Sequence, residues 1–268
     1  ALFFGGQIPI DKKITNIASV SASSTVDPNP SNNSSSASVN VSGTSTSGGT
    51  TGGGSTTGGS WSNVCSFAPG EIIYTILYDG GNIYAGTWGG KIYKSTDNGK
   101  NWAIANSGMN VSFIWSLIKF NGTVYAATEK GVYTFNGTTA AGLAGNDVHA
   151  LATDGTTLFA GTWGYGVFKS TNGTSWTEMN TTSLKGFTAI QSLAVKNGQL
   201  FVGTAGGGIF SSDGMNFTKL TCGYSVIWSL AATTDAIYAG TYGDGLYRSI
   251  DDGMSFTKVT SLNITFVY

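Results

Sequence analysis

Residues 83–95 read Ile-Tyr-Ala-Gly-Thr-Trp-Gly-Gly-Lys-Ile-Tyr-Lys-Ser, which is two strand-like runs joined by a glycine-containing turn. Near copies of this stretch return at residues 124–134, 158–170, 200–211 and 237–249. Equivalent positions in successive copies are 41, 34, 42 and 37 residues apart. A unit of short strands that repeats about every 40 residues cannot bury its own apolar face, so it must pack on further copies. The repeat therefore predicts a propeller or a solenoid.

The strands around this stretch distinguish the two folds. An inner strand of the Ile-Trp-Ser-Leu type lies at residues 114–117, 148–151, 190–193 and 227–230, and an outer strand begins at Trp102, Trp176, Phe217 or Phe256. Apolar and polar residues alternate along these stretches, which gives each strand one packed face. Four antiparallel strands make a propeller blade, and no helical periodicity is present. We expect an all-β fold: a single propeller of five blades with four strands each, or of six blades if strands are donated.

The chain divides into three parts. Residues 1–20 form an apolar arm of two strand-like pieces, and the first piece contains Leu2, Phe3, Phe4, Ile8 and Ile10. Residues 21–60 contain 28 Ser, Thr or Gly residues out of 40, so they cannot bury enough apolar surface to offset the entropy of ordering. This stretch is predicted to be a flexible linker, and its composition also resembles a glycosylated stalk. Residues 61–268 hold the predicted propeller.

Single strand-like segments flank the repeats. Residues 60–64 look like an outer strand with no inner strands before them, and residues 263–268 look like a strand with nothing after them. The two segments can close the ring of blades on each other, or one of them can pair with a strand donated by another molecule.

Charge and hydropathy exclude two classes of partner. The 268 residues carry a net charge of −1 and a single arginine, Arg248. Nucleic acid binding needs clustered Lys and Arg, so no nucleic acid partner is expected. No apolar run reaches the roughly 18–20 residues that span a bilayer, so no membrane span is expected. The apolar start of the chain is too short for a signal-peptide core, which indicates a mature, processed protein.

Ten Asn-X-Ser/Thr sequons indicate a secreted protein with attached glycans. They begin at Asn32, Asn33, Asn40, Asn110, Asn121, Asn136, Asn172, Asn180, Asn216 and Asn263. The alternative is that Asn-Gly-Thr is hairpin-turn chemistry, which would account for Asn121, Asn136 and Asn172. Outside the cell the two cysteines, Cys65 and Cys222, could form a disulfide, although their places in the repeat do not assure that they are adjacent. We expect an extracellular or cell-surface location.

One turn of the repeat carries a more specific motif. Residues 95–102 and 249–256 both read Ser-X-Asp-X-Gly-X-X-aromatic, and residues 170–176 and 211–217 read similarly with one residue deleted. This pattern resembles the Asp-box of β-propellers in sialidases, sortilin-type receptors and related extracellular proteins. The resemblance implies a structural role, in which Asp97, Asp213 and Asp251 accept hydrogen bonds from turn amides and the glycine takes a positive φ. The second repeat has lost the motif near Phe135.

Catalytic groups are not evident. The sialidases that the motif resembles hold their substrate with three arginines, and this chain has one. A glycosidase needs two facing carboxylates, and nothing in the sequence pairs Glu129, Glu178 and Asp244. His149, the only histidine, fits a packed inner-strand residue better than a member of a triad. No Cys/His cluster offers a metal site. We expect no enzymatic activity, no cofactor and no metal.

The position after each Gly-Thr varies between copies, where it is Trp88, Glu129, Trp163, Ala205 and Tyr242. These residues are expected to form part of a ring on one rim of the propeller. Trp88, Trp163 and Tyr242 could stack on sugars or anchor a protein there, or they could pack between neighbouring blades. Trp115 and Trp228, on inner strands, are expected in the core.

Together these features favour a non-enzymatic, secreted and glycosylated protein that associates with itself into a homopolymer. In this hypothesis the N-terminal arm docks on an adjacent copy, and the protein is a subunit of a surface fibre or layer. The alternative is a propeller lectin that binds carbohydrate through Trp88, Trp163 and Tyr242.

Overall fold

The computed structural model describes residue 67, residues 71–260 and residue 267. Several expectations lie outside these residues: those for the arm with Leu2, Phe3, Phe4, Ile8 and Ile10, for the linker, for Cys65, and for the sequons at Asn32, Asn33, Asn40 and Asn263. The division at residues 20 and 60 stays a prediction.

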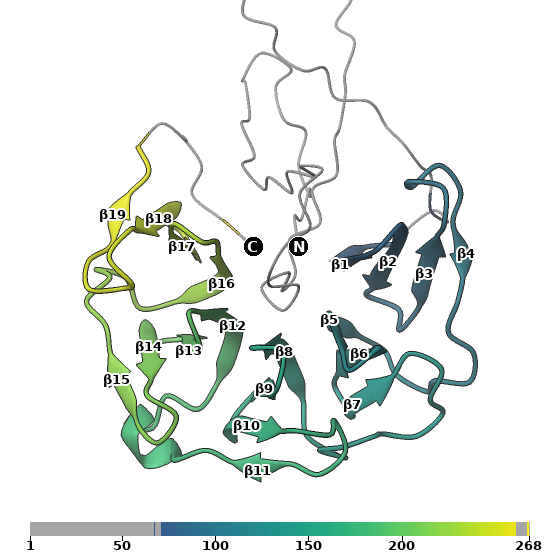
Figure 1. Ribbon diagram of the computed structural model, residues 1–268, viewed down its shortest axis with the longest axis horizontal. Coiled ribbons are helices and arrows are strands. Elements are labelled where there is room, and N and C mark those ends of the chain that lie inside the picture. Colours follow the sequence, from purple (N-terminus) through teal and green to yellow (C-terminus); the bar gives the residue numbers. More distant parts are fainter. Residues whose placement is uncertain (1–66, 68–70, 261–266, 268) are drawn as a thin grey trace, which may run out of the picture.

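Five antiparallel sheets surround a common axis as the blades of a propeller (Figure 1), which confirms the predicted fold. Blade one contains β1 (Ile73–Asp79), β2 (Asn82–Thr87), β3 (Ile92–Ser95) and β4 (Ala103–Ile104). Blade two contains β5 (Ile114–Phe120), β6 (Thr123–Thr128) and β7 (Gly131–Thr134). Blade three contains β8 (Val148–Thr153), β9 (Leu158–Thr162), β10 (Gly166–Ser170) and β11 (Thr177–Glu178). Blade four contains β12 (Ile190–Lys196), β13 (Gln199–Thr204), β14 (Ile209–Ser212) and β15 (Phe217–Lys219). Blade five contains β16 (Ile227–Ala232), β17 (Ile237–Thr241), β18 (Leu246–Ser249) and β19 (Thr257–Lys258), and a 3-10 turn, η2 (Thr181–Leu184), precedes blade four.

Blade two departs from the four-strand pattern. Its sheet has three strands, and an isolated bridge between Val132 and Gly142 takes the place of the fourth. The cause is the loss of the repeated Ser-X-Asp-X-Gly turn sequence after β7, because the chain turns back at once there. The amide of Gly137 donates to the carbonyl oxygen of Thr134 (2.8 Å), and the amide of Ala141 donates to that of Val132 (2.7 Å).

The repeated Gly-Thr pair has two packing roles. A Cβ added to Gly86, Gly161 or Gly203 would collide with the first isoleucine of the next blade's inner strand, so glycine lets successive blades approach. The threonine closes the turn between the second and third strands. Thr162 Oγ1, for example, donates to the carbonyl oxygen of Gly166 at 2.9 Å, and this threonine is fully buried.

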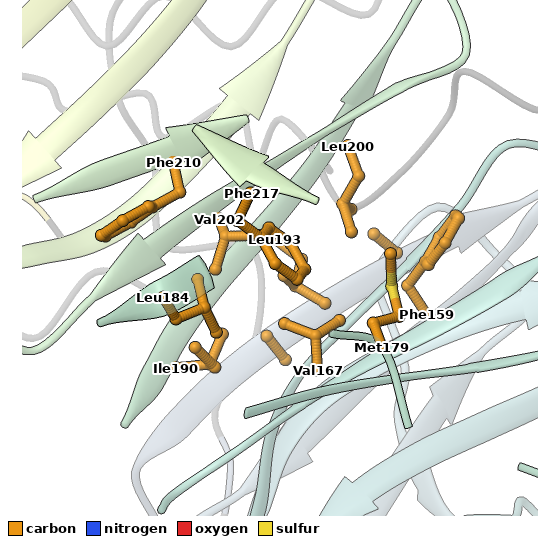
Figure 2. Close-up of a cluster of buried hydrophobic side chains, with 12 residues drawn as sticks. Phe159, Val167, Met179, Leu184, Ile190, Leu193, Leu200, Val202, Phe210 and Phe217 are labelled. Carbon is orange, nitrogen blue, oxygen red and sulfur yellow. The ribbon is translucent and has the colours of Figure 1, made fainter. Parts of the chain in front are cut away.

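The core consists of clusters that lie between neighbouring blades. The largest joins blades three and four (Figure 2), where Phe159 and Val167 meet Leu193, Val202 and Phe210. Each blade is thus held by the apolar faces of its neighbours, as expected for a unit that cannot bury its own face.

The inner strands of successive blades pack on one another in the order β1, β5, β8, β12 and β16. In the part of the chain that the structure describes, β16 and β1 do not pack on each other in the same way. Residue Val267 lies instead against blade five, where its amide donates to the carbonyl oxygen of Thr241 at 3.2 Å.

Candidate functional site

Each inner strand has a β-bulge near its start, and this bulge positions the candidate site. The register shifts lie between Ile73 and Thr75, Ile114 and Ser116, Val148 and Ala150, Ile190 and Ser192, and Ile227 and Ser229. A bulge leaves one residue out of the ladder and re-aims its side chain. The five residues in the bulges are Tyr74, Trp115, His149, Gln191 and Trp228.

Three of these residues join a continuous array of rings over blades one to three, packed edge-to-face at Trp88 and stacked from Phe113 to Trp163, which we call the aromatic ridge. Its members are Tyr74, Trp88, Phe113, Trp115, His149 and Trp163. Ring centroids are 5.0 Å apart for Trp88 and Phe113, 4.9 Å for Phe113 and Trp115, 4.6 Å for Trp115 and His149, and 5.0 Å for His149 and Trp163. The aromatic ridge therefore links the rims of three blades.

The residues after each Gly-Thr combine a backbone that pairs with the next blade, in blades one, three and four, and, where they are aromatic, a side chain that is partly exposed to solvent. Trp88, Trp163 and Ala205 form backbone bridges to the next blade, with Phe113, Ala189 and Val226. The side chains of Trp88, Trp163 and Tyr242 are nevertheless 46%, 45% and 49% exposed. Tyr242 stacks on Trp228 of the same blade, with centroids 5.3 Å apart. The structure thus brings Trp88 and Trp163 into one array and places Tyr242 in a separate pair on blade five.

Glu129 does not join the aromatic surface. Its carboxylate oxygens accept hydrogen bonds from the amides of Ser112 (2.6 Å) and Phe113 (3.1 Å), so the side chain caps the start of its own blade's inner strand. Ala205 contributes no ring. At this repeat position the residue is therefore aromatic in blades one, three and five and not in blades two and four.

Two polar side chains next to the ridge, Asp147 and Gln191, face the ring nitrogens of Trp115 and His149. Trp115 Nε1 donates to Asp147 Oδ1 at 3.0 Å, His149 Nε2 lies 3.2 Å from Asp147 Oδ2, and His149 Nδ1 lies 3.2 Å from Gln191 Oε1. Both imidazole nitrogens thus face an Asp and a Gln rather than a serine hydroxyl. This network orients the rings, and it does not have the geometry of a nucleophilic triad.

Tyr74, Phe113 and His149 were not identified as site residues from the sequence, and Trp115 and Trp228 were assigned to the core. Trp115 does pack against the core cluster between blades two and three, but it is only half-buried because it also stacks in the ridge. A bulge moves a side chain out of strict alternation, so a period-two pattern cannot show where it points.

The turn aspartates hold their own turns. Asp97 Oδ1 accepts from the amide of Asn101 (2.9 Å) and from Ser95 Oγ (2.8 Å), and the amide of Gly99 donates to Ser95 Oγ. These hydrogen bonds, that from the Asn101 amide first, lower the pKa of Asp97 to about 2. Hydrogen bonds from Ser255 lower the pKa of Asp251 to about 2 as well. Such carboxylates are occupied by the fold and are not ligand groups.

The remaining carboxylates and the cysteine have local partners. Asp244 accepts from Tyr247 and pairs with Lys258, and Glu178 accepts from Thr181 at 3.0 Å. No group of three or more His, Cys, Asp or Glu side chains that could hold a metal occurs among the described residues.

Cys222 is a buried free thiol, and Cys65 lies outside the described range, so the disulfide stays a prediction. None of the described helices has the length and hydropathy to cross a bilayer.

The described sequon asparagines all lie on the surface. The exposed residues are Asn110, Asn121, Asn136, Asn172, Asn180 and Asn216. Asn172 also serves its turn, because its Oδ1 accepts from the amides of Thr174 (2.9 Å) and Ser175 (2.8 Å). Exposure permits glycan attachment at these positions, and their use stays a prediction.

Comparisons with known proteins agree with this architecture. The family model of the DUF6242 beta propeller domain matches residues 140–264, just under half of the chain. No curated protein matches the sequence.

Solved structures are similar at low identity. An extracellular domain of a protein assigned to the hybrid two-component systems of B. thetaiotaomicron is 20% identical with a TM-score of 0.61, over 74% of this chain and 30% of that one. An ancestral GH74 enzyme is 16% identical with a TM-score of 0.59, over 72% of this chain and 32% of that one. YCF48, in complex with a D1 peptide, is 17% identical with a TM-score of 0.59, over 75% and 72%. This chain thus spans about a third of the first two proteins, and identities this low show the fold alone. The structure and the comparisons together show that the chain is a β-propeller protein.

Proposed function

We propose that this protein is a non-enzymatic, extracellular structural protein, a glycosylated subunit of a surface fibre or layer that assembles through its N-terminal arm. One observation carries the proposal: blade five binds residue Val267 beyond its own four strands. The amide of Val267 donates to Thr241, and Ser229 Oγ donates to the carbonyl oxygen of Val267 at 3.4 Å. The inner end of blade five therefore forms hydrogen bonds with a segment outside its own four strands, as the docking of a donated arm would require.

Other features support the same function. Among the described residues β16 and β1 do not pack on each other as the other neighbouring inner strands do, which supports a docking place for further strands between blades five and one. The exposed sequon asparagines suit an extracellular surface. The turn aspartates, Glu129 and His149 have structural partners, which leaves no described carboxylate pair poised for hydrolysis.

Deleting residues 1–20 tests the proposal. Secreted material from the intact chain should contain polymers under the electron microscope, and material from the deletion variant should contain only single propellers. The matched control deletes residues 31–50, an equal length of linker, and should keep the polymers. Polymers that survive loss of the arm, or an intact protein that never polymerises, would contradict the proposal.

A second function, carbohydrate binding, is supported by the aromatic ridge. Sugars stack on exposed aromatic faces, and Trp88 and Trp163 stand nearly half-exposed at two points of a rigid ring array. A glycan array probed with the arm-deleted protein should then show hits that Trp88→Ala and Trp163→Ala each weaken. Met215→Ala, an exposed apolar change on blade four, is the control. An array with no hits would remove this candidate and leave the fibre proposal intact.

A further inference from the structure

Val267 occupies the position at which the next blade begins. A Cβ added to Gly240 would lie 2.7 Å from Val267 Cγ1. The equivalent glycines of blades one, three and four, which are Gly86, Gly161 and Gly203, meet Ile114, Ile190 and Ile227 in the same way, and these isoleucines start β5, β12 and β16. The sequence agrees, since Phe-Val-Tyr at residues 266–268 parallels Phe-Ile-Trp at 113–115 and Val-Ile-Trp at 226–228.

The other end of the ring carries the outer part of a blade. Trp61 stands 12 residues before Ile73, as Trp102 stands 12 residues before Ile114. In blade one, Trp102 directly precedes the outer strand β4. Residues 55–61 read Ser-Thr-Thr-Gly-Gly-Ser-Trp, which parallels the turn Ser-Thr-Asn-Gly-Thr-Ser-Trp at 170–176 between β10 and β11. The sequence of a blade's last turn and outer strand thus recurs ahead of blade one.

The entry into blade one follows the same course as the later connections. Phe67 packs on Tyr93 and Trp102 with ring centroids 5.1 Å and 5.2 Å away, which places it on the outer side of blade one. Gly108, which stands 41 residues later in the repeat, lies against Thr138 on the outer side of blade two. Residue 67 therefore has the position expected of a link from a preceding blade.

Counting strands shows what such a blade needs. In the four-stranded blades the hydrogen-bonded order runs inner, second, third, outer, so the inner and outer strands are never neighbours. The segments around Val267 and Trp61 match the inner and outer positions respectively. A blade built from these two segments therefore needs two middle strands between them to reproduce that order.

We propose that a sixth blade lies between blades five and one, and that its two middle strands are the arm, residues 1–20, of a second copy of this chain. This inference rests on the proposed function and assigns the site at which the arm docks. The arm fits because it carries two strand-like apolar pieces, the number of strands that this blade needs.

The length of the linker favours donation by a second copy over the chain's own arm. Within one chain, the third strand is joined to the outer strand by a short turn, such as residues 170–176. The 34 residues from 21 to 54 are far more than such a turn needs. Fully extended they would reach roughly 110 Å, enough to span to a neighbouring propeller.

Complementation between two defective variants tests the inference. Val267→Asp keeps the arm but places a charge where the sixth blade packs on Gly240, and deletion of residues 1–20 keeps the acceptor but removes the donor. Neither variant should polymerise alone, whereas a mixture should give a 1:1 complex by light scattering. Val267→Ile, which introduces the residue found at the start of β5, β12 and β16, should polymerise like the parent.

The possible failures are distinguishable. If arm deletion abolishes polymers but Val267→Asp does not, the arm docks elsewhere, and the sixth-blade inference falls while the proposed function stands. If the intact chain is monomeric and the mixture gives no complex, the arm folds back on its own propeller, and both the sixth-blade inference and the proposed function are wrong.

A synthetic peptide of residues 1–20 provides a second readout that does not depend on Val267→Asp folding. The peptide should bind the arm-deleted protein and block polymer growth, and Ile8→Asp with Ile10→Asp in the peptide should abolish both effects; an unchanged peptide that does not bind would also overturn the inference.

Discussion

Asp97 shows that a repeated residue can have all of its hydrogen bonds within its own turn. Its carboxylate binds the amide and the side-chain amide of Asn101 and the hydroxyl of Ser95, and the ring nitrogen of Trp102 donates to the carbonyl oxygen of Gly99 at 2.8 Å in the same turn. In the third blade the same place is held by Asn172, whose Oδ1 accepts equivalent backbone bonds. The requirement is therefore for an acceptor oxygen, and a negative charge is not essential.

The first prediction concerns the pH dependence of stability. The folded-state pKa values of Asp97 and Asp251 are lowered from 3.8 to about 2, so both groups bind fewer protons in the folded state than in the unfolded state between these values. Their contribution to stability is complete above the unfolded pKa and is lost as the pH falls from about 4 towards 2. The melting temperature of the arm-deleted protein should fall over this range, and Asp97→Asn with Asp251→Asn should flatten the fall. Asp97→Ala should lower the melting temperature at pH 7 more than Asp97→Asn. Equal acid sensitivity of parent and double variant would contradict this account.

The second prediction concerns the Gly-Thr glycine. In Gly203→Ala the new Cβ would lie 2.8 Å from Ile227 Cγ2 and would also collide with Ser192, so blades four and five must move apart. Overpacking of this kind typically costs about 1–3 kcal/mol of unfolding free energy. Gly206→Ala is the matched control, because nothing lies within 4 Å of its added Cβ. Urea unfolding should separate the two variants, and equal midpoints would show that the blades do not need the glycine.

At this scale the sequence predicts part of the surface. The repeat register predicts Trp88, Trp163 and Tyr242 as rim residues; their side chains are about half-exposed, and their role in binding stays a prediction. It did not place Tyr74 and His149 beside them, because both lie in bulges whose direction is set by strand pairing and not by the local pattern.

At the scale of elements, the blades are predictable where the turn motif is present. Blades one, three, four and five carry the full or the shortened turn sequence and have an outer strand, whereas blade two lacks both. The loss of the motif near Phe135 was visible in the sequence. The absence of the fourth strand in blade two could not be predicted from that loss, because whether a two-residue outer strand forms depends on the geometry of the turn before it.

The third prediction tests the packing between blades. Phe210, on β14, is fully buried in the cluster that joins blades three and four (Figure 2). Phe210→Ala should lower the unfolding free energy by about 3–5 kcal/mol through lost burial and a new cavity. Met215→Ala, whose side chain is 76% exposed on the same blade, should change it by less than about 0.5 kcal/mol. Chemical denaturation of both variants measures the difference, and a mild Phe210→Ala would show that the cluster does not hold the blades together.

Among the described residues the five blades follow one another around a common axis, and blades one and five do not pack on each other as the other neighbouring blades do. Blades two, three and four pack on a neighbour on both sides, while blades one and five each have one described neighbour blade. The sequence predicted the number of blades from five copies of one stretch. It left open how the ends are satisfied, because that depends on contacts between segments about 200 residues apart and, in our proposal, between molecules.

The fourth prediction follows from this asymmetry. In a repeat protein each unit is stabilised mainly by its neighbours, so a blade with one neighbour should open locally more often than a blade with two. In the arm-deleted monomer, amides of β1, β2, β16 and β17 should exchange hydrogen about tenfold or more faster than those of β8, β9, β12 and β13. In polymers of the intact chain the end blades should become as protected as the middle ones, because each gains the missing neighbour. Hydrogen exchange read by mass spectrometry on both samples measures this. Uniform protection in the monomer would mean that the five blades close without help, and end blades that stay unprotected in the polymer would mean that the subunits meet at another surface.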